Sequence, residues 1–78
     1  MFEKIKQLLI ECANVDEEKI TKDAKLKDLG IDSLYAVEMI LELETAFSIQ
    51  IEYEEMEQLI TVDDVVKLVT RKEKELNA

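Results

Sequence analysis

Several residue types that support β structure or acid–base catalysis are scarce in this chain. Its 78 residues include no histidine, proline or tryptophan, one glycine, two tyrosines and two phenylalanines. Sequences with so few turn-forming and aromatic residues seldom form β sandwiches or barrels, whereas a hydrophobic content of 47% is sufficient for a core. We therefore expect a single all-α domain spanning residues 1–78.

The absence of histidine also restricts the chemistry that the chain can perform. A serine or cysteine nucleophile needs a neighbouring base, which in most enzymes is histidine. In addition, a domain of this length buries only about 60% of its unfolded surface, which leaves little room for a deep active site. We therefore expect a carrier or binding protein and not an enzyme, and no metal site.

Cysteine is limited to Cys12, so no disulfide can form within the chain. Small domains without disulfides are typical of reducing compartments, which indicates the cytoplasm. The first residues, MFEKIKQLLI, carry charge within four positions and contain no continuous apolar run, so we expect neither a signal peptide nor a membrane span. Cys12 itself falls on an apolar helical stripe and is predicted to be a buried, unreactive thiol.

Basic residues are missing from the middle of the chain. The 39 residues from Asp28 to Val66 contain eleven carboxylates and no lysine or arginine, whereas the flanks hold eight acids and ten bases. This charge disfavours nucleic acid and membranes as partners and favours basic protein surfaces. The alternative is that the acidic residues only keep a small protein soluble.

Apolar spacing predicts three main helices and one short helix. The main helices cover residues 2–13, 33–47 and about 62–75, and the short helix lies around residues 54–59. The connection 14–32 has irregularly spaced apolar residues, so we expect it to pack over the core by its own side chains, with a helical turn around Asp16 to Lys19.

The predicted helix 33–47 carries two apolar stripes. The first stripe suits the core and contains Ala36, Met39, Ile40, Leu43 and Phe47. The second stripe contains Leu34, Val37 and Leu41, flanked by glutamates. The second stripe either contacts other helices of the domain or binds a partner, and Leu34 and Val37 are the better candidates for exposure.

Local signals mark where two of the helices begin. Gly30 supplies backbone freedom before the second main helix, and Asp32 stands at its predicted N-cap. Thr61 and Asp64 have the spacing of a capping box at the start of the last helix.

Ser33 has three candidate roles. As a nucleophile it would lack a base, because no histidine exists and no lysine lies between Lys27 and Lys67. It is otherwise a plain first-turn residue, or its hydroxyl receives a group from another enzyme. The start of a helix suits the third role, since unpaired N–H groups and the helix dipole favour an attached phosphate there.

The segment Asp28-Leu29-Gly30-Ile31-Asp32-Ser33-Leu34, followed by Val37-Glu38-Met39 and Leu43-Glu44-x-x-Phe47, resembles the acyl carrier proteins of fatty acid and polyketide synthesis. The likeness extends over essentially the whole chain. It implies a four-helix bundle, monomeric, in which a dedicated transferase esterifies Ser33 with 4′-phosphopantetheine from coenzyme A. The thiol of that arm then carries acyl groups as thioesters between enzymes.

The same resemblance assigns roles to further residues. Around the attachment site it places Gly30, Asp32 and Leu34. On the surface that meets basic patches of the transferase and of acyl-handling enzymes it places Asp32, Leu34, Tyr35, Val37, Glu38, Leu41 and Glu44. Along a space for the acyl chain it places Met39, Leu43, Leu59 and Val65.

Some positions depart from the family's usual pattern. Tyr35 and Thr45 replace residues that are often acidic, Ile31 replaces a small residue and Glu52 stands where proline is common. The expected pathway is fatty acid synthesis or, as these departures suggest, a specialised lipid or polyketide pathway. Alternatives are a carrier of aminoacyl, peptidyl or D-alanyl groups and, from another class, an unmodified acidic helical adaptor.

Overall fold

A computed structural model describes residues 1–76 of the chain. It contains four helices, α1 (Phe2–Ala13), α2 (Ser33–Phe47), α3 (Tyr53–Glu57) and α4 (Val62–Leu76), and two 3₁₀ turns, η1 (Glu17–Lys19) and η2 (Leu26–Leu29). Within residues 1–76 no strand forms, and one isolated antiparallel bridge joins Lys25 to Thr61. The predicted all-α bundle of three main helices and one short helix is confirmed.

The helix boundaries follow the predictions closely, with α3 as the main difference. This helix begins at Tyr53 and ends at Glu57, before the predicted end at Leu59. A capping box sets its start, because the Glu52 and Glu55 side chains each accept a hydrogen bond from the other residue's backbone N–H. The turn η2 was not predicted, since its four residues are too short to show a helical period.

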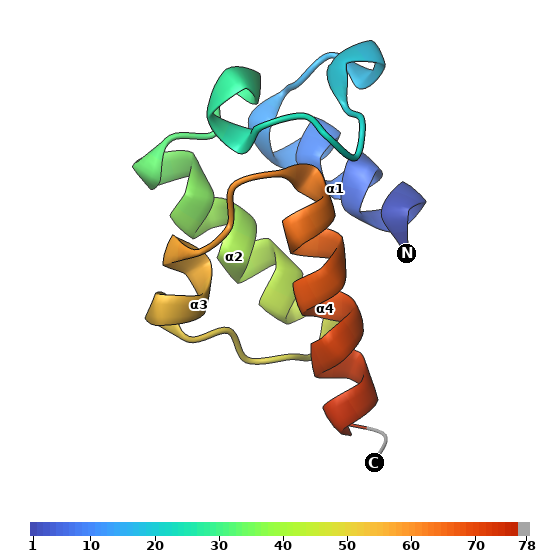
Figure 1. The fold of residues 1–78 in the computed structure, drawn as a ribbon, viewed down its shortest axis with the longest axis vertical. Helices are drawn as coiled ribbons and strands as arrows, with labels where there is room; N and C mark the ends of the chain where they lie inside the picture. The colour runs from blue at the N-terminus through green and yellow to red at the C-terminus, as the bar shows by residue number, and fades with distance from the viewer. Residues whose placement is uncertain (77–78) are drawn as a thin grey trace.

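The three long helices pack together, and the first connection covers one end of the bundle (Figure 1). Its own side chains hold it there, because Val15, Ile20, Leu26 and Ile31 are all buried. This confirms the expectation for residues 14–32. The short α3 lies beside α2, and the chain then returns toward the first connection before α4 begins (Figure 1).

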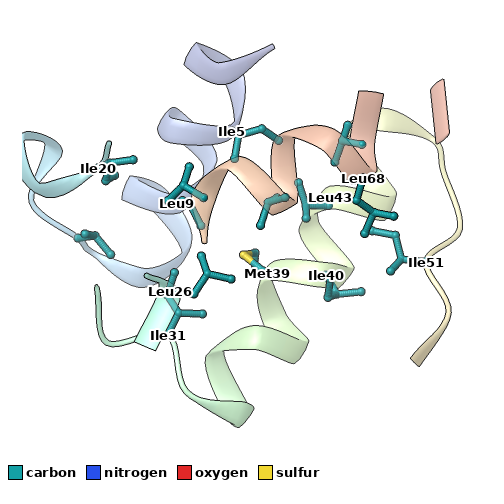
Figure 2. Close-up of a cluster of buried hydrophobic side chains, with 14 of the residues drawn as sticks. Ile5, Leu9, Ile20, Leu26, Ile31, Met39, Ile40, Leu43, Ile51 and Leu68 are labelled. Carbon is teal, nitrogen blue, oxygen red and sulfur yellow. The ribbon is translucent and has the colours of Figure 1, made fainter. Parts of the chain in front are cut away.

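The core lies where α1, α2 and α4 meet. Its fully enclosed side chains include Ile5 and Leu9 from α1, Met39 and Leu43 from α2, and Val65 from α4. Figure 2 shows Met39 near the centre of this cluster, with Leu26 and Ile31 of the first connection on one side and Leu43 on the other. Apolar contacts of the core therefore attach the end of the first connection to the start of α2, where Ser33 lies.

Candidate functional site

Ser33 is the first residue of α2, and the residues before it determine how it is presented. Gly30 adopts the left-handed conformation with φ of 82°, which turns the chain out of η2 at no steric cost. Ile31 is buried and anchors the loop. Asp32 then caps the helix, because its Oδ1 accepts hydrogen bonds from the backbone N–H groups of Leu34 (3.2 Å) and Tyr35 (3.3 Å). The predicted N-cap is confirmed.

The Ser33 side chain is exposed to solvent. Within residues 1–76 its hydroxyl makes no hydrogen bond, and the neighbouring Asp32 carboxylate is engaged by backbone N–H groups. A hydroxyl in this position lacks a base that would make it a nucleophile, but an enzyme can reach it and attach a group.

An apolar cavity of about 410 Å³ opens beside Ser33. It lies between the end of the first connection, the first two turns of α2 and the segment that includes α3. Its walls are formed by Lys25, Leu26, Lys27, Ile31, Asp32, Ser33, Ala36, Met39, Met56, Leu59 and Ile60. The attachment candidate therefore stands at the edge of a space large enough for a small apolar ligand.

Two of the four residues expected along an acyl-chain space line this cavity. Met39 and Leu59 form part of its wall, whereas Leu43 and Val65 do not. Leu43 and Val65 are completely buried, because they pack in the core where the long helices meet. The open cavity thus lies nearer to Ser33, between α2 and the α3 segment, and the acyl-chain space itself stays a prediction.

The second apolar stripe of α2 faces solvent. Leu34 is 69% exposed and Leu41 57% exposed, and Tyr35 and Val37 are also exposed. The Leu34 and Leu41 side chains are therefore not required for the core. A solvent-facing apolar stripe on an otherwise acidic helix is typical of a surface that contacts a partner.

The three acidic residues expected to dock partners differ in exposure. Asp32 and Glu38 are exposed beside the apolar stripe. Glu44 is half-buried instead, and its Oε2 accepts a hydrogen bond from the backbone N–H of Ile51 at 3.0 Å. This bond spans seven residues and holds the connection between α2 and α3, while a docking role for Glu44 stays a prediction.

The Cys12 thiol is half-buried and so less enclosed than expected. It lies in a shallow depression together with Glu38, Leu41 and Glu42. Burial raises the pKa of the Cys12 thiol, and the charges of Glu38 and Glu42 raise it further. A raised pKa lowers the fraction of thiolate, which disfavours reaction of Cys12 as a nucleophile.

Residues that the sequence did not reveal extend the surface and the cavity. Tyr53, at the start of α3, is 68% exposed and shares a groove of about 190 Å³ with Val37, Leu41 and Met56. The Glu52 and Glu55 spacing is a local signal that could have located this helix start. Lys25 and Lys27 come to the cavity from one segment and Ile60 from another, and no pattern in the sequence marks them.

Among residues 1–76, every helix is too short or too polar to cross a bilayer. The same residues hold no group of three or more histidine, cysteine, aspartate or glutamate side chains placed to share a metal ion.

Comparison with known proteins defines the class. The family model described as a phosphopantetheine attachment site matches residues 3–69, and the chain belongs to this family. Its fold is similar to the crystal structure of an acyl carrier protein from Thermotoga maritima, with a TM-score of 0.85 and 27% sequence identity over 95% of this chain and 87% of that chain.

The family and the fold together establish a carrier domain of the acyl carrier protein type. Such domains are carriers and not enzymes, and their prosthetic group is covalently attached 4′-phosphopantetheine. Their partners are the transferases that modify them and the enzymes that handle acyl groups.

Proposed function

We propose that Ser33 is the attachment point for 4′-phosphopantetheine and that the chain carries acyl intermediates as thioesters on that arm. The observation that supports this most strongly is the position of Ser33. It is exposed, it is the first residue of a capped helix, and it stands at the edge of an apolar cavity. An incoming transferase can reach the hydroxyl without unfolding the bundle.

The residues around Ser33 fit the phosphate end of the arm. The first turn of α2 presents the positive end of the helix dipole, which favours a phosphodiester at this position. When attached, the group supplies a thiol that forms thioesters, so the protein itself needs no catalytic base. Gly30 and Asp32 keep the loop and the helix start in place, and Leu34 lies next to the site on the exposed face.

The cavity supports a second part of the proposal, namely shelter for the carried chain. Ala36, Met39, Met56 and Leu59 provide apolar walls, and a flexible methionine on each side allows the space to adapt to different chains. Burying an apolar chain there removes it from water at a gain of about 25 cal/mol per Å².

Docking of partner enzymes is assigned to the exposed face of α2. Asp32 and Glu38 provide negative charge there, while Leu34, Val37 and Leu41 provide apolar contact. Complementary charge speeds the encounter with a basic patch, and a small interface permits fast release. Both properties suit a carrier that visits several enzymes in turn.

The chain is further proposed to act as one monomeric domain of the cytoplasm, in a specialised lipid or polyketide pathway. Two side chains of the docking face support the pathway. Tyr35 presents an exposed ring, and Thr45 turns its hydroxyl back to donate to the Leu41 carbonyl at 3.0 Å. Neither residue contributes the charge expected of a carrier for general fatty-acid synthesis.

Intact mass measurement tests the proposed attachment. The protein is incubated with coenzyme A and a broad-specificity phosphopantetheinyl transferase, and the mass of one phosphopantetheine is expected to be added. Ser33→Ala should abolish the addition. Ser48→Gly, which changes the other serine and suits its left-handed backbone, should retain it. An unchanged wild-type mass would favour the unmodified adaptor.

A further inference from the structure

The cavity beside Ser33 has basic residues on its wall, although it adjoins the acidic half of the chain. Lys25 and Lys27 line it together with Asp32 and Ser33. Both lysine side chains are exposed. In the described part of the chain, ion pairs engage Lys6, Lys19, Lys67, Arg71 and Lys72, but neither of the two cavity lysines.

Backbone contacts hold these two lysines beside the site. Lys25 is bridged to Thr61, and the N–H of the next residue, Leu26, donates to the Ile60 carbonyl at 2.9 Å. The Lys27 carbonyl accepts a hydrogen bond from the Gly30 N–H at 3.1 Å. Leu26, between the two lysines, is buried and anchors the turn in the core. The segment that carries both cations is therefore fixed at two points.

The charges near Ser33 create a need for such cations. A phosphodiester on Ser33 would carry one negative charge next to the Asp32 carboxylate, and like charges at short distance repel each other. The segment from Asp28 to Val66 contains no lysine or arginine that could offset this repulsion. Lys25 and Lys27 are the basic residues among those that line the cavity.

We propose that Lys25 and Lys27 form an anion-binding rim that holds the phosphodiester of the arm and directs the arm across the mouth of the cavity. The proposal rests on the attachment at Ser33 proposed above. It deepens that function, because the rim would favour the sheltered position of the carried chain over the extended one.

A carboxylate on the cargo would offer the same chemistry to the two lysines. The phosphodiester is favoured because it is bonded to Ser33, which lines the same cavity as both cations. The remaining walls are mainly apolar and suit an uncharged chain. A carboxylate on the cargo is therefore the alternative ligand of the two lysines, and the test must distinguish it from the phosphodiester.

The test uses fully modified protein, with complete modification verified by intact mass. We compare wild type with Lys25→Gln/Lys27→Gln and with the control Lys22→Gln/Lys74→Gln. The control removes the same charge from two exposed lysines that do not line the cavity and that form no ion pair within residues 1–76. Phosphorus-31 NMR relaxation then reports the mobility of the phosphodiester directly.

In the cavity variant we expect faster phosphorus motion than in wild type and in the control. A second measurement follows hydroxylamine cleavage of an octanoyl thioester on the arm, which is slow while the chain is sheltered. Each exposed charge-assisted contact contributes little free energy to the sheltered position. Loss of both contacts should therefore accelerate cleavage of the thioester by only roughly three- to tenfold. Lys25→Arg/Lys27→Arg should behave like wild type, since arginine keeps the charge.

The outcomes separate the inference from the proposed function. If Ser33 receives no phosphopantetheine, the proposed function fails. If modification is complete but phosphorus mobility and cleavage rate are equal in the cavity variant and the control, only the anion-binding rim is overturned. If the lysines matter only when the arm carries a succinyl group, and not with octanoyl or without cargo, the anion is the cargo carboxylate and the proposal for the phosphodiester is rejected.

Discussion

Lys72 of α4 lies with its Nζ 2.8 Å from Oε1 of Glu55 in α3, and Arg71 reaches the other oxygen of the same carboxylate at 2.7 Å. Glu55 also accepts a hydrogen bond from the Glu52 N–H at 3.0 Å. One carboxylate thus caps α3 and connects it to α4. Because α3 has only five residues, its position depends on such contacts, and its Met56 forms part of the cavity wall.

We expect Glu55→Ala to lower the free energy of unfolding by about 1–2 kcal/mol, since it removes a helix cap and two partly exposed ion pairs. The melting temperature of a domain of this size should fall by roughly 4–8 °C for each kcal/mol. Glu57→Ala, an exposed residue of the same helix, should have little effect. Equal melting temperatures for the two variants would contradict the role assigned to Glu55, and differential scanning calorimetry measures them.

Stability should depend on pH through two carboxylates. The hydrogen bond from Lys72, followed by that from the Glu52 backbone, lowers the pKa of Glu55. Hydrogen bonds from the backbone N–H groups of Thr61 and Ile60 lower the pKa of Asp64. A pKa that is lower in the folded state contributes stability above the ordinary pKa, and this contribution is lost as pH falls through the lowered value.

Glutamine and asparagine resemble the protonated forms of these groups. Glu55→Gln and Asp64→Asn should therefore be less stable than wild type at pH 7, and each difference should shrink as the pH falls below about 4. Urea unfolding at a series of pH values measures the differences. If the difference in free energy of unfolding between wild type and variant stays constant down to pH 2.5, the carboxylate charges do not contribute to stability.

The exposed stripe of α2 should matter for partners and not for folding. Because Leu34 and Leu41 are mostly exposed, their replacement by alanine should change the free energy of unfolding by no more than about 0.5 kcal/mol. The kcat/KM of the phosphopantetheinyl transferase should fall at least about fivefold, which corresponds to roughly 1 kcal/mol of lost contact. Leu76→Ala, which changes an exposed leucine at the other end of the chain, is the matched control. An equal fall in kcat/KM for all three variants would reject the docking surface.

Alkylation kinetics test the environment of Cys12. Since burial is the largest cause of its raised pKa, iodoacetamide at pH 7.5 should react more slowly with Cys12 than with a free cysteine. Glu38→Gln/Glu42→Gln should accelerate the reaction without reaching the rate of a free thiol. Glu3→Gln/Glu18→Gln changes the net charge equally on exposed residues and should leave the rate unaltered. A fast reaction in wild type would exclude the protonated, partly enclosed thiol.

The sequence by itself determined the features that depend on neighbouring residues. Helical spacing predicted α1, α2 and α4, because one apolar face of each helix must be buried. The caps at Asp32 and Thr61 were also predictable, since each is formed by hydrogen bonds between residues no more than three positions apart. For the same reason the sequence indicated that Ser33 begins a helix three residues after Gly30.

Only the tertiary structure decided how distant segments meet. It turned Glu44 to the backbone of Ile51, joined Glu55 to Lys72 across seventeen positions, and brought Lys25 beside the cavity that Leu59 also lines. It also enclosed Leu43 and left Leu41 exposed, although both lie on the same helix. Each of these outcomes depends on which helix faces pack together and on the space that remains between them. Packing of that kind is a property of the whole core, and a local pattern of residues does not contain it.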